Sequence, residues 1–182
     1  SHTAYYKGYL QDLRISKKVI YTGCFVPPAS LHANLVTTPN DPMCDEVALN
    51  IQSDTTNNTD AITDISVNAH TITNTGPARH ETEKPLFGSS SLKFASGDIL
   101  LINQTNDLNI NGDFTLETWI YVNTNPANAY GSSTDSHVIA SCWHSNTSNV
   151  NWQLLYTSSG EIVYSEYVGT TTVFAKAAAS LN

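Results

Sequence analysis

The sequence predicts an all-β protein whose strands form an antiparallel sandwich or barrel, and three observations lead to this prediction. No window keeps apolar residues at positions i, i+3, i+4 and i+7, which is the pattern of an amphipathic helix. Many short runs of β-branched and aromatic residues alternate with polar residues instead. Turn clusters rich in Asn, Ser, Thr, Gly and Pro separate these runs, as they do in all-β sandwiches and barrels.

The individual strands follow from this alternation. In residues 114–122 (FTLETWIYV), Phe114 and Leu116 face opposite to Glu117 and Trp119. The alanine-rich residues 174–182 are the best helical candidate by propensity, although they could equally finish a strand. The expected strands are 9–15, 46–54, 70–74, 91–94, 99–102, 114–122, 137–143, 150–157, 160–168 and 170–175.

The composition is that of a globular but weakly charged protein. Only 13% of the 182 residues are charged, and Ser, Thr and Asn take their place. The net charge is −8, and the basic cluster of Arg14, Lys17 and Lys18 is too small for a phosphate-binding groove. No apolar run approaches the length that crosses a bilayer. We therefore expect neither nucleic-acid binding nor membrane insertion.

One domain boundary is visible in the sequence. Residues 26–43 carry four prolines and no strand pattern, and proline lacks the N–H group that a strand ladder needs. We place a Pro-rich linker at residues 29–43. Residues 1–28 hold one clear strand, which is too little for a stable sheet, whereas residues 44–182 hold all the others.

Four stretches, in order and in register, carry a resemblance to a known family. They are ALNIQSDTT (48–56), ITDISVNAHTIT (62–73), FGSSSLKFASGDIL (87–100) and NINGDFTLETWIYV (109–122). They resemble the laminin G-like members of the concanavalin A-like jelly-roll superfamily, in the version found in phage and marine viral tail fibres and in bacterial surface proteins. The resemblance implies an antiparallel β-sandwich of jelly-roll topology. It also implies a buried Trp119 and a packed, hydrogen-bonded His70.

The first strand resembles the other end of a unit of the same family. The stretch GYLQDLRISKKVIYTGCFVPP (8–28) is similar to the family's closing strand, with Lys18 in place of a common glycine. The resemblance implies that residues 1–28 close one laminin G-like unit and that residues 44–182 form the N-terminal two-thirds of the next, as in a tandem repeat. The remaining strands of the second unit would come from an adjacent repeat or from a neighbouring chain.

An enzymatic function is not expected. Glucanases of this superfamily carry paired carboxylates on one strand face, because retaining hydrolysis needs two carboxyl groups close together. The matching strands here hold Glu117 alone and Glu161 alone. The chain also lacks G-x-S-x-G and H-E-x-x-H motifs, and its only arginines are Arg14 and Arg79.

Glycan binding is the site chemistry that the aromatic residues allow. It needs flat aromatic faces beside polar groups, in an exposed loop or on a concave sheet. Aromatic residues of sandwiches often belong to the core instead, and Trp143 and Trp152 have this alternative. The candidate glycan-binding residues are Tyr130, Trp143, His144, Asn146 and Trp152.

Calcium and a disulfide are the two further possibilities. No cofactor is required, but an Asp-rich loop is where calcium would bind, and its candidate ligands are Asp54, Asp60 and Asp64. Solvated turn aspartates are the alternative interpretation. Cys24 and Cys44 flank the linker, where they either form a disulfide or remain free thiols.

Together these features predict a non-enzymatic adhesion or glycan-binding module of a fibre or surface protein, extracellular and on a virion or cell surface. Its partners would be a host or cell-surface glycan or protein, and further copies of itself or adjacent repeats. The alternative is a purely structural repeat that assembles into a fibre or particle shell by sharing strands between chains. A glucanase-like hydrolase ranks third.

Overall fold

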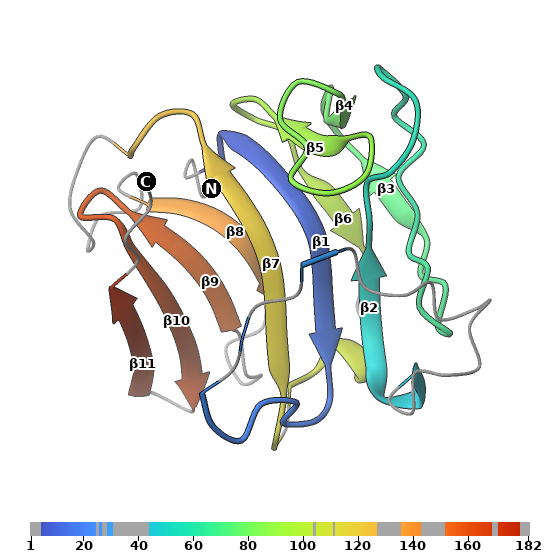
Figure 1. Cartoon of the computed structure of the whole chain (residues 1–182). Helices are drawn as coiled ribbons and strands as arrows, with labels where there is room; N and C mark the ends of the chain where they lie inside the picture. The colour runs from blue at the N-terminus through green and yellow to red at the C-terminus, as the bar shows by residue number, and fades with distance from the viewer. Residues whose placement is uncertain are drawn as a thin grey trace. The chain divides into compact units, whose positions relative to one another are not determined.

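A computed structural model of the chain describes residues 5–24, 26, 29–30, 44–103, 105–110, 112–126, 136–142, 152–168 and 171–178. These residues form an all-β protein of antiparallel sheets with almost no helix, which confirms the predicted fold class at this level (Figure 1). The strands are β1 (Gly8–Ser16), β2 (Val47–Ile51), β3 (Ile72–Asn74), β4 (Arg79–Glu81), β5 (Ser91–Phe94), β6 (Leu100–Ile102), β7 (Thr115–Val122), β8 (Ser136–Cys142), β9 (Trp152–Thr157), β10 (Glu161–Val168) and β11 (Thr171–Ala178). Two short 3-10 helices are η1 (Cys44–Glu46) and η2 (Asn106–Leu108).

The chain divides into two compact units, which we describe separately. One unit comprises residues 8–94 and 98–121, and the other comprises residues 1–7, 95–97 and 122–182. The first holds a five-stranded sheet in the order β2-β1-β5-β4, with β7 also paired to β1, and the two-stranded sheet β3-β6. The second holds a four-stranded sheet in the order β11-β10-β9-β8.

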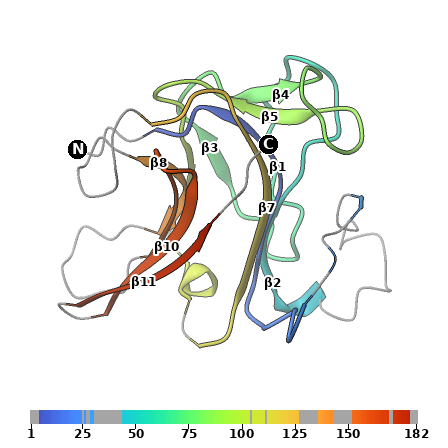
Figure 2. The same ribbon diagram turned by 60° about the vertical axis from the view of Figure 1, so that its left-hand side comes forward.

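Strand β1 is the central element of the five-stranded sheet. It pairs with β5 through Gly8–Leu10 and with β2 through Leu13–Ser16, and it also pairs with β7, beside which it runs in Figure 2. All of its residues are buried. The sheet partners of this strand therefore come from later residues of the same chain. The assignment of residues 1–28 to a preceding repeat stays a prediction.

A backbone irregularity at Asp12 separates the two pairing regions of β1. Asp12 has a φ of 58°, in the left-handed region that costs most residues about 1–2 kcal/mol but that Asp tolerates better. Its carboxylate accepts a hydrogen bond of 3.0 Å from Gln52 Nε2.

In the second unit, consecutive strands form a simple antiparallel meander. The β9–β10 connection turns at Gly160, whose φ is 79° and whose N–H donates to the Thr157 carbonyl at 3.0 Å. Leu155 and Val163 lie opposite each other in the β9–β10 pair and are 3% and 0% exposed. Burying each of these side chains contributes about 1.5–3 kcal/mol, so this pair anchors the core of the unit.

Most of the expected strands are confirmed. The structure also contains elements that the sequence did not predict, and it decides between helix and strand for one segment. These elements are the 3-10 helices and β4, a polar strand of Arg79, His80 and Glu81 that pairs with β5 and shows no alternation of its own. The open choice for residues 174–182 is resolved for residues 174–178, which belong to β11 and not to a helix. Trp119 is half-buried, not fully buried as the family resemblance implied. Its indole instead packs edge-on against Phe87, with 5.6 Å between the ring centroids.

Candidate functional site

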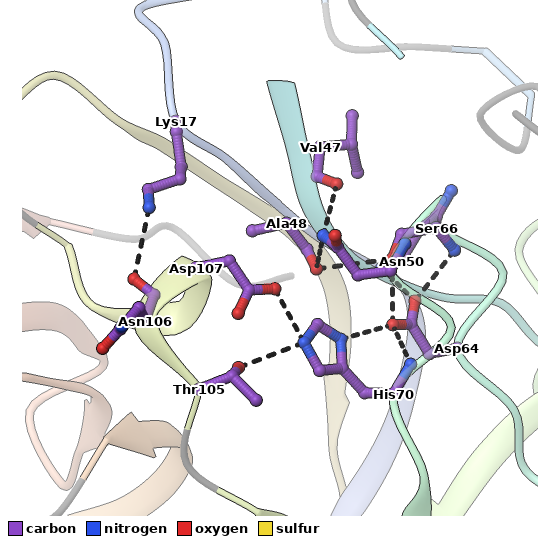
Figure 3. Close-up of polar contacts among 11 residues, drawn as sticks. Lys17, Val47, Ala48, Asn50, Asp64, Ser66, His70, Thr105, Asn106 and Asp107 are labelled. Atoms are coloured by element: carbon purple, nitrogen blue, oxygen red, sulfur yellow. Dashed lines mark hydrogen bonds and ion pairs between the residues drawn. The ribbon is translucent and has the colours of Figure 1, made fainter. Parts of the chain in front are cut away.

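An extended polar network, which we call the Asp64 cluster, is formed by the buried Asp64 with the partly buried His70, Thr105 and Asp107 (Figure 3). The first two residues lie in the loop that follows β2, and the last two lie at η2. The His70 Nδ1 atom is 2.7 Å from Asp64 Oδ2, and its Nε2 atom is 2.7 Å from Asp107 Oδ2. The expectation of a packed, hydrogen-bonded histidine is confirmed.

Asp64 is the centre of this network because its carboxylate accepts five hydrogen bonds. Three come from the backbone N–H groups of Asn50, Ser66 and His70, at 3.0, 2.9 and 2.9 Å. The others come from the Ser66 hydroxyl at 2.9 Å and from the His70 ring. Burial acts to raise the pKa of Asp64, but the three backbone donors outweigh it and hold the pKa below its usual value.

Neighbouring side chains attach the same loop to β2. Lys17, the residue after β1, is attached to η2. The Asn68 amide donates to the Ala48 carbonyl at 3.1 Å, and the Ser66 hydroxyl donates to the same oxygen at 3.3 Å. The Lys17 ammonium donates to the Asn106 carbonyl at 3.3 Å (Figure 3). The cluster therefore joins segments that are far apart in the sequence, which is a structural role.

The Asp64 cluster is not arranged as a nucleophile and its base. Thr105 Oγ1 lies 3.2 Å from His70 Nε2, so Asp64, His70 and Thr105 superficially follow the order of a catalytic triad. Both ring nitrogens of His70, however, face carboxylate oxygens, which can only accept hydrogen bonds. Thr105 Oγ1 therefore shares Nε2 with Asp107 Oδ2, which lies closer to it, at 2.7 Å against 3.2 Å. Burial acts to raise the pKa of the Asp107 carboxyl. Hydrogen bonds from the Thr105 hydroxyl and from a backbone N–H, and the interaction with His70, lower this pKa more strongly, so it lies below its usual value.

A serine–histidine pair, Ser53 and His80, is closed to solvent. Ser53 Oγ lies 2.7 Å from His80 Nδ1 and 2.9 Å from Ser90 Oγ, and both serines are 0% exposed. Burial lowers the pKa of His80. A substrate has no access to this hydroxyl, so the pair serves the core of the sheet.

The three calcium candidates do different things in the structure. Asp54 accepts hydrogen bonds from the Ser89 backbone N–H and hydroxyl, at 2.6 and 2.8 Å, and so closes a turn. Asp60 is exposed, and Asp64 is buried with its oxygens engaged as described. Across the described ranges, no three His, Cys, Asp or Glu side chains converge in a way that could hold a metal ion. The assignment of calcium stays a prediction.

Four of the five glycan candidates, Tyr130, Trp143, His144 and Asn146, lie outside the described residues. The fifth, Trp152, is 4% exposed and stacks on Tyr164, with 6.4 Å between centroids and 23° between planes. In this arrangement the Trp152 ring belongs to the core of its unit, which is the alternative that the sequence left open.

The proposed disulfide is only half described. Cys24 is exposed. The side chain of Cys44 lies outside the described residues, so the Cys24–Cys44 bridge stays a prediction.

Sequence reasoning missed a surface group that we call the Tyr121 patch, formed by Tyr9, Glu83, Lys84, Lys93 and Tyr121. The Tyr9 and Tyr121 rings meet edge-on at 6.0 Å, and the Lys84 ammonium lies 5.0 Å from the centroid of the Tyr121 ring. The Tyr9 hydroxyl donates to Glu83 Oε2 at 2.5 Å, and Lys93 Nζ lies 3.3 Å from the same oxygen. No sequence motif signals this patch, because it depends on the pairing of β1 with β7.

The other carboxylate of interest, Glu117 on β7, is engaged by Tyr21, whose hydroxyl donates to Glu117 Oε1. Burial and this carboxylate raise the pKa of Tyr21 to about 12. The contact holds the segment after β1 over β7, together with the Thr115 hydroxyl, which donates to the Lys18 carbonyl at 2.7 Å. Glu117 therefore has a structural partner in place of a second carboxylate.

Comparisons with family models, with curated proteins and with solved structures found no match to this chain. Among the helices of the described residues, none has the length and apolar character to span a bilayer.

Proposed function

We propose that this chain is a non-enzymatic adhesion module, a laminin G-like jelly roll of a fibre or surface protein that binds a glycan or protein on a host or cell surface. An extracellular location, on a virion or a microbial surface, belongs to the same proposal. The antiparallel all-β architecture is compatible with such a module. The four-motif resemblance supplies the jelly-roll topology.

The observation that carries the non-enzymatic part of the proposal is how the acid–base side chains are used. His70 is held between two carboxylates, Ser53 and His80 are buried together, and Glu117 is bound by Tyr21. A general acid or base needs a free position beside its substrate. Each of these groups in the described part of the chain is instead engaged in an internal contact.

The glycan-binding part rests on the connections on either side of β8. The connection that carries Tyr130 leads into β8 at Ser136, and the one that carries Trp143 leaves it at Cys142. These residues lie outside the described ranges, so what supports them as contacts is the aromatic and polar character of the two segments in the sequence.

A glycan array tests this function with the full chain and two variants. We expect saturable binding to particular glycans, with weaker binding after Tyr130→Ala or Trp143→Ala. A Val26→Ala variant serves as control, because Val26 is 89% exposed. Loss of binding in this control to the same degree, or no binding by the wild type, would contradict the proposal.

The second candidate function is a structural repeat that assembles by strand sharing. Strand β11 ends its sheet, and within the described residues it pairs with β10 alone along eight residue pairs. A long unpaired edge is a template for another strand. Analytical ultracentrifugation distinguishes the two functions, because strand sharing predicts concentration-dependent assembly without glycan, whereas adhesion predicts glycan binding at any state of assembly.

A further inference from the structure

We propose that the Tyr121 patch is a binding site for a neutral pyranose, which it holds through two neighbouring hydroxyl groups. The proposal rests on the glycan-binding function above and gives it a site and a ligand class. The site is formed by β1, β5, β7 and the segment of residues 82–90, all within one unit.

The Tyr121 ring provides an accessible aromatic surface in a fixed orientation. The residue is 48% exposed, although its ring contacts both Tyr9 and the Lys84 ammonium. Leu86, two residues after Lys84, is also 55% exposed. The C–H face of a pyranose packs against such a surface, in the way that ligand sites combine apolar area with a few polar groups.

Glu83 and Lys84 provide an acceptor and a donor beside the ring. The Glu83 side chain is 57% exposed, and its contacts with Tyr9 and Lys93 both use Oε2. Among the described residues, Oε1 has no partner and Lys84 has no carboxylate within 4.0 Å. One sugar hydroxyl can donate to Glu83 Oε1 while its neighbour accepts from the Lys84 ammonium, and hydrogen bonds to charged groups are the stronger kind.

Charge selects a neutral sugar over an acidic one. Hydrogen bonds from the Tyr9 hydroxyl and from Lys93 lower the pKa of Glu83, so its carboxylate is ionised at neutral pH. A uronate or sialate held through the same Glu83 contact would bring its carboxylate up to the ionised Glu83 side chain, which repels it. A neutral pyranose satisfies both polar groups without this repulsion.

The segment that carries these groups is held firmly by Gln11. Its amide nitrogen donates to the carbonyls of Phe87 and Ser90 at 2.6 and 2.8 Å, and its amide oxygen accepts from the backbone N–H groups of Leu86 and Phe87 at 2.8 and 3.1 Å. Phe87 also packs against Trp119. The backbone that follows Lys84 is therefore fixed, and the acceptor Glu83 is held through Oε2 by Tyr9 and Lys93, which lowers the entropic cost of binding.

The test is a titration of the ¹⁵N-labelled full chain with methyl galactopyranoside and methyl mannopyranoside, followed by amide chemical shifts. We expect shifts in residues 83–86 and 120–122, and binding that is about tenfold weaker after Glu83→Gln or Tyr121→Ala. Tyr121→Phe keeps the ring and should keep binding. Lys84→Gln should weaken binding, whereas Lys18→Gln, the same change at an exposed lysine outside the patch, should not.

Two results would overturn the inference. One is the absence of shifts in the patch with both neutral glycosides, while array binding remains and is lost after Tyr130→Ala or Trp143→Ala; the proposed function would then stand without this site. The other is equal or tighter binding of methyl glucuronoside at the patch, which would contradict the neutral ligand class. A chain that binds no glycan on the array contradicts the proposed function itself.

Discussion

Replacing Asp64 by alanine is the sharpest test of how the loop after β2 is held in place. The change leaves two buried backbone N–H groups, one partly buried backbone N–H group and the His70 ring without their acceptor. Each buried donor that loses its partner costs about 1–3 kcal/mol. Partial relaxation of the loop and water entry reduce the sum of these costs. We therefore expect Asp64→Ala to lower the free energy of unfolding by about 3–5 kcal/mol.

The assay is urea unfolding followed by far-UV circular dichroism and tryptophan fluorescence, with coincidence of the two transitions as the test of two-state behaviour. Asp60→Ala is the matched control, since Asp60 lies exposed in the loop before Asp64 and its removal should change the free energy by less than about 0.5 kcal/mol. A loss below about 1 kcal/mol for Asp64→Ala, with a normal value for the control, would refute the reasoning that this carboxylate organises the loop.

Three further predictions follow from the same contacts. The pKa values of Asp64 and Asp107 are lowered in the folded state. The stability that these two carboxylates contribute is therefore complete above the unfolded carboxyl pKa of about 4 and is lost as the pH falls through the lower folded values. The midpoint of urea unfolding should decline less steeply from pH 6 to pH 2.5 in Asp64→Asn than in the wild type. Gly88→Ala should destabilise the chain by about 1–3 kcal/mol in the same assay, because Gly88 has a φ of 60° and an added Cβ would lie 2.6 Å from Asp54 Cγ, whereas Gly97→Ala, at positive φ but in open space, should cost less. Removal of calcium with EDTA should leave the melting temperature unchanged, because Asp54 and Asp64 already accept internal hydrogen bonds. A fall of several degrees, restored by added calcium, would contradict this prediction.

The strands were predictable because their signal is local. Alternation in β7 and the β-branched or aromatic runs in β9 and β10 appear within a few residues of sequence. Strand β4 has no such signal, because its three polar residues become a strand only through pairing with β5. The 3-10 helices are equally short and carry no periodicity that a sequence pattern could reveal.

The pairing of β1 and the groups that depend on it could not be predicted from local patterns. The sequence indicates that Leu13 and Ile15 need a sheet, but not that β2 supplies it across the Pro-rich segment. The Tyr121 patch requires that pairing together with β7, which brings Tyr9 beside a residue more than a hundred positions away. Asp64 similarly gives no sign in the sequence that its carboxylate is buried, because solvated turns and buried acceptors share the same residue types.

The measurement that tests the central claim most directly is binding of the full chain to an array of neutral and acidic host and cell-surface glycans, with the products analysed for cleavage. The account predicts saturable binding to particular glycans and recovery of those glycans intact. The absence of binding at every spot, or the release of shortened glycans, would contradict a non-enzymatic adhesion module.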